Sequence, residues 1–391
     1  MSENKNTINR RDFFKGAAMG ALGGSVLAMG VYSYSPWRKA QFPPVKRKMV
    51  DIGACKYVKI TNISETSWFN NADLMNDIKG AGGLLVDQYL YNWPPFGDGT
   101  GLGKGSYEKG IAKIKHLLPN DVDEAWDITE KLSVHPENAG GYACLIEMEE
   151  MNGKQHKYLL DSGWSYKWTH ECFKREGIDE MLKNREIEAL FISHEHFDHY
   201  WGIPVTFKYD PNIPIYIPDT FYPEGLQYLK DSGHTGEVIK VKPGLKPIVP
   251  GFATYVFPIP IICRVYGEQS MYFNVKDHGL VSVTGCCHQS IIQFAETAYQ
   301  EIKYENDELY GVYGGLHVSP FEDWDPKYDD LVLSLGKYDF KKIGCNHCTG
   351  IVCAKKFAEA GYPIVKGTAR YRSKEDVYLG NSDRIGFGIE V

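Results

Sequence analysis

Residues 191–199 read Phe-Ile-Ser-His-Glu-His-Phe-Asp-His, which puts three imidazoles and an aspartate into one short run. The preceding residues, 187–192, are apolar and of strand length, so the run is expected on a loop that leaves the end of a buried strand. Imidazole and carboxylate ligands together suit borderline metals such as zinc, iron or manganese. Unrelated surface histidines would not be expected directly behind a buried strand. The pattern therefore predicts a metal site.

The composition is that of a globular protein with a sizeable core. The chain has 391 residues, of which 43% are hydrophobic and 24% charged. A formal net charge of −7 and the lack of a Lys/Arg run argue against nucleic acid as a partner. The nine cysteines have no framework spacing and leave the redox compartment open, while 26 Tyr and 8 Trp could line a pocket for a small-molecule substrate.

The N-terminus resembles an export signal. Residues 9–15, Asn-Arg-Arg-Asp-Phe-Phe-Lys, and the glycine- and alanine-rich stretch 16–31 are typical of twin-arginine signals. We therefore expect residues 1–35 to engage the twin-arginine export machinery and the protein to be periplasmic or otherwise exported. The alternative is an uncleaved membrane anchor, although glycine-rich stretches make poor spanning helices. Residues 36–50 read as a linker into one domain, 51–391, whose part 51–140 is an N-terminal extension.

A β-hairpin is predicted ahead of the central motif. Two apolar runs, 142–148 and 156–160, flank Asn152-Gly153, and Asn-Gly between such runs is a strong hairpin signal. The second run ends in Asp161-Ser162-Gly163. An Asp-Ser-Gly sequence also forms turns on its own, so its role is open from the residues alone.

Other segments are less specific. Residues 57–63 predict a strand, 112–118 a short helix, and 205–250 short strands separated by Pro/Gly turns. The glycine-rich residues 97–105 fit neither the Walker A spacing nor G-x-G-x-x-G, so a surface or lid loop is expected.

Three further strand-like runs end in histidines. They are residues 280–288, 310–317 and 343–350, which carry His288, His317 and His347. One histidine after a strand is usually a hydrogen-bonding residue, but repetition of the same layout indicates a shared site. The pair Cys345 and Cys348 could form a disulfide or half of a zinc site, although no second C-x-x-C completes it.

The run H-x-H-x-D-H resembles the signature of the metallo-β-lactamase superfamily. That resemblance implies an α/β fold, the four-layer αββα sandwich, with metals at one edge between the two sheets. Together with D-x-G, T-G-C-x-H, G-G-x-H and H-C-T-G, residues 130–390 are similar to the branch named for dihydropterin–ribofuranosyl-aminobenzene-phosphate synthase.

The resemblance implies two metal-ligand sets: His194, His196 and His288 for one metal, and Asp198, His199 and His347 for the other. Zinc is expected, with manganese or iron as alternatives.

The resemblance also gives roles to residues around the metals. Cys286 falls where many relatives keep a bridging Asp, so it is either a thiolate ligand or a small buried residue beside the site. Asp161 would support the metal loop from behind the ligands. Asp198 and His317 are the candidate catalytic residues, His317 as a substrate-facing acid or phosphate contact. His234 lies in Gly233-His234-Thr235, which begins like a Gly-His-Thr-x-Gly segment that supplies a metal ligand in many relatives, but it also fits a plain loop histidine.

These residues favour an exported dinuclear hydrolase that uses metal-activated hydroxide on a small ester-, lactone- or phosphate-like substrate. The alternative within the resemblance is a transferase, in which the metals bind a diphosphate leaving group and an arylamine attacks. A redox di-iron site ranks last, because flavodiiron relatives carry Glu at the position of His196. A non-hydrolytic metal-binding protein remains an alternative, against which the complete ligand sets argue.

Overall fold

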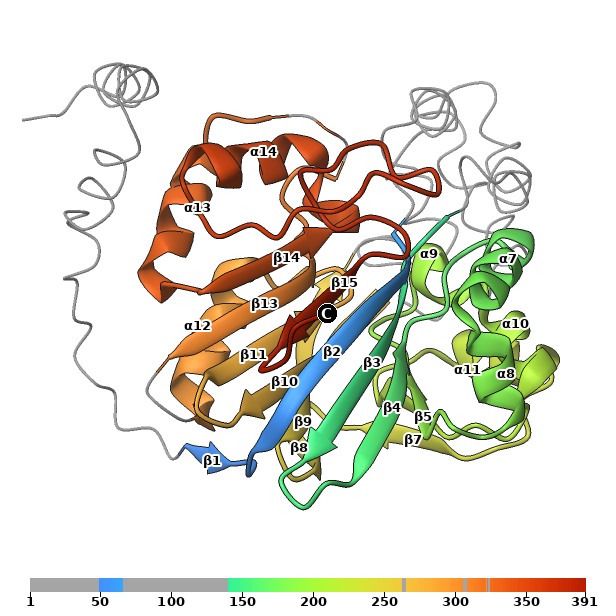
Figure 1. Cartoon of the computed structure of the whole chain (residues 1–391). Helices are drawn as coiled ribbons and strands as arrows, with labels where there is room; N and C mark the ends of the chain where they lie inside the picture. Colours follow the sequence, from blue (N-terminus) through green and yellow to red (C-terminus); the bar gives the residue numbers. More distant parts are fainter. Residues whose placement is uncertain (1–48, 66–139, 262–264, 305–307, 321, 323) are drawn as a thin grey trace, which may run out of the picture.

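The computed structural model describes residues 49–65, 140–261, 265–304, 308–320, 322 and 324–391 (Figure 1). The export signal, nearly all of the linker, most of the N-terminal extension, the glycine-rich residues 97–105 and the helix expected over 112–118 lie outside these ranges and stay predictions. Within the described residues, no helix is both long and apolar enough to cross a membrane.

Among the described residues, thirteen strands are hydrogen-bonded into one sheet. Its two halves meet where β10 joins β2 through the pair Val275–Cys55. The first half has the order β15 (Arg384–Phe387), β2 (Cys55–Ser64), β3 (Ala143–Glu150), β4 (Gln155–Leu160), β5 (Ala189–Phe191), β6 (Ile215–Pro218) and β7 (Val238–Val241). The second half has the order β14 (Lys342–Asn346), β13 (Leu309–Gly315), β11 (Gly279–Thr284), β10 (Val265–Val275), β9 (Phe252–Ile261) and β8 (Gly244–Val249). A separate small sheet pairs β1 (Val50–Asp51) with β12 (Ile302–Lys303).

Helices cover the outer face of each half (Figure 1). The first half carries α7 (Tyr166–Glu176), α8 (Ile178–Lys183), α9 (Phe197–Tyr200), α10 (Ile203–Tyr209) and α11 (Pro223–Asp231). The second half carries α12 (Ile291–Glu301), α13 (Tyr328–Leu335) and α14 (Ile351–Glu359), with the 3₁₀ turns η6 (Gly336–Tyr338) and η7 (His347–Thr349).

Three hydrophobic clusters separate four layers. One cluster joins the helices of the first half to its strands, through residues such as Phe173 and Ile203. A second joins the helices of the other half to their strands, including Phe294 and Phe357. The third lies between the two halves of the sheet, where Ile60 of β2 shares a cluster with Phe273 of β10. The predicted αββα order is therefore confirmed.

Local sequence explains several element ends. The predicted hairpin is confirmed as β3 and β4, with the Asn152 side chain accepting from the Lys154 backbone N–H at 2.8 Å and Gly153 at φ 93°. Helix α7 begins where Ser165 accepts a hydrogen bond from the backbone of Trp168, and it ends at Gly177 in the left-handed conformation.

The expectation for residues 205–250 is wrong in part. Strands β6, β7 and β8 are present, but α10 precedes them and α11 lies between β6 and β7. Proline misled the prediction, because it occupies the first turn of both helices, where its missing N–H costs nothing.

Parallel pairing decides where the site lies. Strands β4, β5, β6 and β7 run parallel in one half, and β11, β13 and β14 run parallel in the other. The segments that follow these strands therefore leave from the same edge of each half. In sheets of this kind the edge at the carboxyl ends of the strands is where ligands bind.

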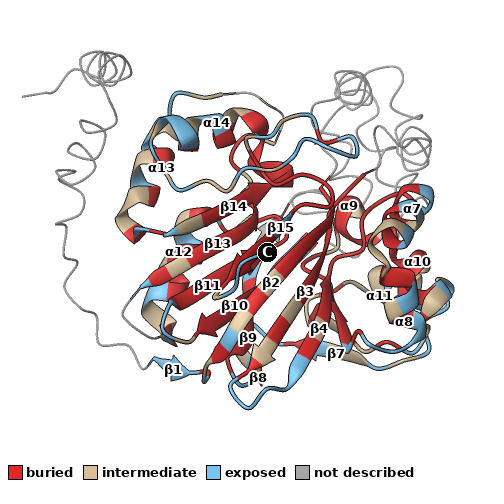
Figure 2. Cartoon of the chain, viewed as in Figure 1, coloured by how far each residue is buried: buried red, intermediate tan, exposed pale blue. Residues whose placement is uncertain are grey.

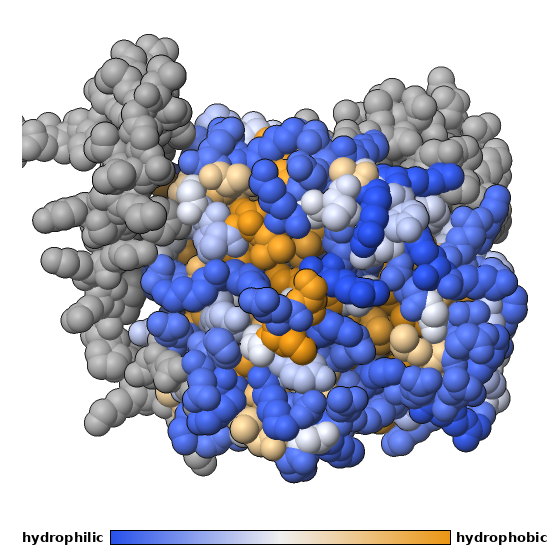
Figure 3. Space-filling model, viewed as in Figure 1, coloured by the Kyte–Doolittle hydropathy of each residue, from blue (hydrophilic) through white to orange (hydrophobic). Residues whose placement is uncertain are grey.

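Burial follows the layers. Figure 2 shows mostly buried strands between helices whose outer sides are exposed. Figure 3 shows a mainly hydrophilic face with apolar atoms gathered near its middle, where Figure 1 places the C-terminus. Ile389 and Val391 of that segment are exposed, and single apolar side chains of this kind are normal on a protein surface.

Candidate metal centre

The central motif spans a loop and a helix. His194 and His196 lie on the loop after β5, as predicted, but Asp198 and His199 lie in the first turns of α9, which begins at Phe197. The ligand atoms of the two side chains lie close together, with His199 Nε2 3.7 Å from Asp198 Oδ2, and all four of His194, His196, Asp198 and His199 are buried. Glu195 points elsewhere, since its carboxylate accepts the backbone N–H of Tyr222 at the start of α11.

His194, His196 and His288 form a first ligand group. Their ligand atoms lie within 4.8 Å of one another, and His194 Nε2 is 2.9 Å from His196 Nδ1. Burial, followed by repulsion from neighbouring imidazoles, lowers the pKa of His194 and of His288 well below the ordinary histidine value. Neutral imidazoles offer a lone pair to a metal, so this donor set fits a divalent ion.

Asp198, His199 and His347 form a second group of the same size. His347 Nε2 is 3.2 Å from Asp198 Oδ2 and 3.2 Å from His199 Nε2. Burial opposes ionisation of Asp198, but His199 and His347 outweigh it and hold the pKa of this carboxyl well below its usual range. The group thus offers one carboxylate and two imidazoles, again a fitting set for a divalent metal.

Asp161 positions ligands in both groups. It follows β4 with φ 61° and is fully buried. Its Oδ2 accepts from His199 Nδ1 at 2.7 Å and from Ser193 Oγ at 2.7 Å, and Ser193 Oγ is 2.8 Å from His194 Nδ1. Because the serine proton goes to Asp161, the His194 ring must donate from Nδ1. Both rings are thereby held in the tautomer that leaves Nε2 available to a metal.

Glu268 fixes the position and tautomer of His288. The sequence did not suggest this role. It lies on β10, fully buried, and its Oε2 accepts from His288 Nδ1 at 3.0 Å and from the His288 backbone N–H at 2.7 Å. Its Oε1 accepts from the backbone N–H of Cys287 at 2.7 Å. The available signal was the polar run Glu268-Gln269-Ser270 inside an otherwise apolar strand, since buried polar residues need partners.

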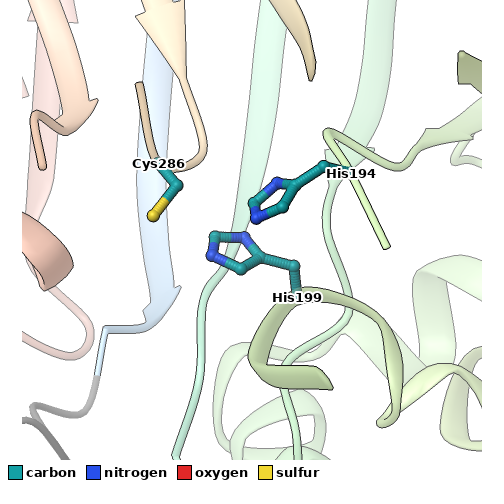
Figure 4. A group of neighbouring side chains, drawn as sticks. All are labelled: His194, His199 and Cys286. Atoms are coloured by element: carbon teal, nitrogen blue, oxygen red, sulfur yellow. The ribbon is translucent and has the colours of Figure 1, made fainter. Parts of the chain in front are cut away.

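Cys286 faces two groups of side chains. Figure 4 shows it on the loop after β11, opposite His194 and His199, and the ligand atoms of these three residues lie within 4.8 Å. Its sulfur is also 3.3 Å from His317 Nδ1 and 3.0 Å from Cys348 Sγ.

Two other predictions can be placed. Cys345 and Cys348 do not form a disulfide with each other, since both are thiols and Cys348 turns toward Cys286. His234 bonds the backbone carbonyl of Ile213 at 2.8 Å through Nε2 and packs on Phe207, and within the described residues it belongs to no ligand group. It is therefore the plain loop histidine of the two alternatives.

Residues 141–260 match the metallo-β-lactamase superfamily model. This match covers hairpin strand β3, Asp161 and the whole central motif, but fewer than half of the residues of the chain. It supports the predicted superfamily, and with the two ligand groups it supports a metal-dependent hydrolase. The pterin-synthase branch stays a prediction.

Solved structures match the chain with low sequence identity and low TM-scores. A metal-dependent hydrolase of the β-lactamase superfamily, Tm1679, is 19% identical over 63% of this chain and 91% of its own, with a TM-score of 0.44. The metallo-β-lactamase fold protein YhfI from Bacillus subtilis is 16% identical over 56% and 84%, with a TM-score of 0.38. A quorum-quenching N-acyl homoserine lactone lactonase is 18% identical over 43% and 70%, with a TM-score of 0.29. These likenesses are too low to assign a substrate. The search of curated proteins gave no match.

Proposed function

We propose that this protein is an exported dinuclear metallohydrolase, with one divalent ion on His194, His196 and His288 and a second on Asp198, His199 and His347. The observation that carries the proposal is the pair of three-donor groups at one sheet edge, each containing one histidine, His288 or His199, whose Nδ1 is held by a buried carboxylate. Such support is typical of histidines that ligate metals. The export rests on the N-terminal sequence alone.

The chain's own residues supply binding and orientation. Asp161 and Glu268 fix ring positions and tautomers, and Asp198 contributes the negative charge of the site. When bound, two divalent ions would supply activation of a water and polarisation of a substrate oxygen. The substrate class that suits this chemistry is a small ester, lactone or phosphate ester.

The transferase alternative makes a different prediction about products. A hydrolase releases the same products with and without an added arylamine, whereas a transferase needs the amine and incorporates it. Product analysis of a diphosphate substrate in both conditions separates the two functions.

The proposal is tested by elemental analysis of metal per chain in the full-length protein. We expect two or more metals in the wild type and at least one fewer in His196→Ala, with hydrolytic activity lost. His234→Ala is the matched control, because it removes a histidine that lies outside the ligand groups. A wild-type protein that neither carries metal nor takes it up would refute the proposal.

A further inference from the structure

A third group of donors lies beside the two ligand groups of the proposed hydrolase. It consists of Cys286 after β11, His317 after β13 and Cys348 in η7, and its ligand atoms lie within 4.8 Å of one another. The Cys286 sulfur is the centre of the group, 3.0 Å from Cys348 Sγ and 3.3 Å from His317 Nδ1. Both thiols are buried, with 2% of Cys286 and none of Cys348 exposed.

The other buried cysteines in the described part of the chain do not converge in this way. Cys345 and Cys353 are equally buried, but within the described residues neither belongs to a group of potential ligands. They are the ordinary case of a cysteine that packs as a small apolar residue. Cys286 and Cys348 differ, because two sulfurs and an imidazole nitrogen point at one small volume.

We propose that Cys286, His317 and Cys348 bind a third metal ion, of the thiophilic divalent class to which zinc belongs. Two thiolates and one imidazole are a donor set that zinc prefers over magnesium or calcium, and three protein ligands leave one tetrahedral position open. Binding replaces the two thiol protons, which pass to solvent, by two metal–sulfur bonds. No oxidant or reductant is needed.

Charge balance favours this site in its buried surroundings. Two thiolates neutralise the two positive charges of the ion, so occupancy adds no net charge to the interior. The neighbouring ligand group, His194, His196 and His288, brings no negative charge of its own. It lies close to the third group, since the centroids of the His288 and His317 rings are 4.3 Å apart.

The proposal gives His317 a different role from the one expected from the sequence. Its Nδ1 is directed at the Cys286 sulfur, so the ring would act as a ligand rather than as a substrate-facing acid. It also gives Cys286 a place in the third group rather than between the two metals of the hydrolytic site.

The test is a cobalt titration of the full-length protein, reduced and stripped of metal with a chelator. Cobalt(II) bound to thiolate gives an intense near-ultraviolet charge-transfer band, and imidazole or carboxylate ligation does not. We expect three equivalents bound, with the band accounting for one. Cys348→Ala should lose the band and one equivalent and keep the other two. His317→Ala, which keeps both thiols, should weaken the equivalent that gives the band. Magnesium, added in place of cobalt, should neither bind to the third group nor produce the band.

Cys353→Ala is the matched control, since it removes a buried thiol of α14 outside the group and should keep all three equivalents. A band that survives in Cys348→Ala but not in Cys286→Ala would overturn the proposal and make Cys286 a ligand of the dinuclear centre. A mass lower by two hydrogens in the unreduced wild type, with no such deficit in Cys348→Ala, would overturn it in favour of a disulfide between Cys286 and Cys348. Loss of the histidine-bound equivalents alone would instead contradict the proposed function and leave the thiolate site standing.

Discussion

Replacement of Glu268 by glutamine should weaken metal binding at the group that contains His288. The carboxylate accepts hydrogen bonds at both oxygens, from the His288 ring and backbone on one side and from Cys287 on the other. A glutamine keeps only one oxygen, so its NH₂ group must face N–H donors on one of the two sides. Whichever side the NH₂ group takes, the loop that carries His288 loses a hydrogen bond that Glu268 accepts in the wild type.

The magnitude follows from the role of such partners. Loss of the group that orients a metal-bound histidine typically costs tenfold to a hundredfold in metal affinity, or about 1.4–2.8 kcal/mol. We therefore expect the dissociation constant of the metal on the His288 group to rise tenfold to a hundredfold in Glu268→Gln. The metal on Asp198, His199 and His347 should keep its affinity.

The assay is competition with a chromophoric chelator, alongside thermal unfolding of the metal-free protein to separate folding from binding. Glu296→Gln is the matched control, because Glu296 is a half-buried carboxylate of α12 that pairs with Lys337 away from the ligand groups. A folded Glu268→Gln protein with unchanged affinity for every metal would refute the positioning role.

Three further changes test other parts of the structure. Asp161→Asn should weaken the metal on the Asp198 group about tenfold to a hundredfold, again measured by chelator competition, and an unchanged affinity would contradict the tautomer argument. Burial raises the pKa of Glu65 from 4.5 to about 8, so the folded state keeps a proton that the unfolded state releases, and stability falls as pH rises through this range. Glu65→Gln should remove this contribution to the pH dependence of the free energy of unfolding, which is at most about 1.4 kcal/mol per pH unit. The measurement is urea unfolding of both proteins between about pH 5 and about pH 8. Equal pH slopes in the two proteins would exclude a proton held by Glu65. Gly141→Ala places a Cβ 2.2 Å from the Asp198 backbone oxygen at φ 70°, so it should lower the free energy of unfolding by about 1–3 kcal/mol or more in thermal melts. Gly153→Ala, at φ 93° with nothing within 4 Å of its Cβ, should cost only the backbone strain.

Much of the site could be predicted from local sequence. Ligand residues follow strands directly, and strand length, β-branched content and turn residues are local properties. The hairpin around Asn152-Gly153 and the strands before His288 and His347 were recovered for that reason. The two helices of residues 205–250 were not, because proline marks both turns and first helical turns, and the sequence alone does not distinguish them.

By itself the sequence determined which side chains this protein offers to metals. It also determined that these side chains follow strands at several points along the chain. Only the tertiary structure decided which of them meet. His347 lies 148 residues from His199 and 3.2 Å from it in space, because the two sheet halves pack together. Within the second half, the order of β10, β11 and β14 brings Glu268 to His288 and Cys286 to Cys348. The hydrophobic effect that joins those halves is non-directional, so a pattern of apolar residues predicts burial but not partners. Partners are fixed when strand order and register bring particular carboxyl ends to one edge.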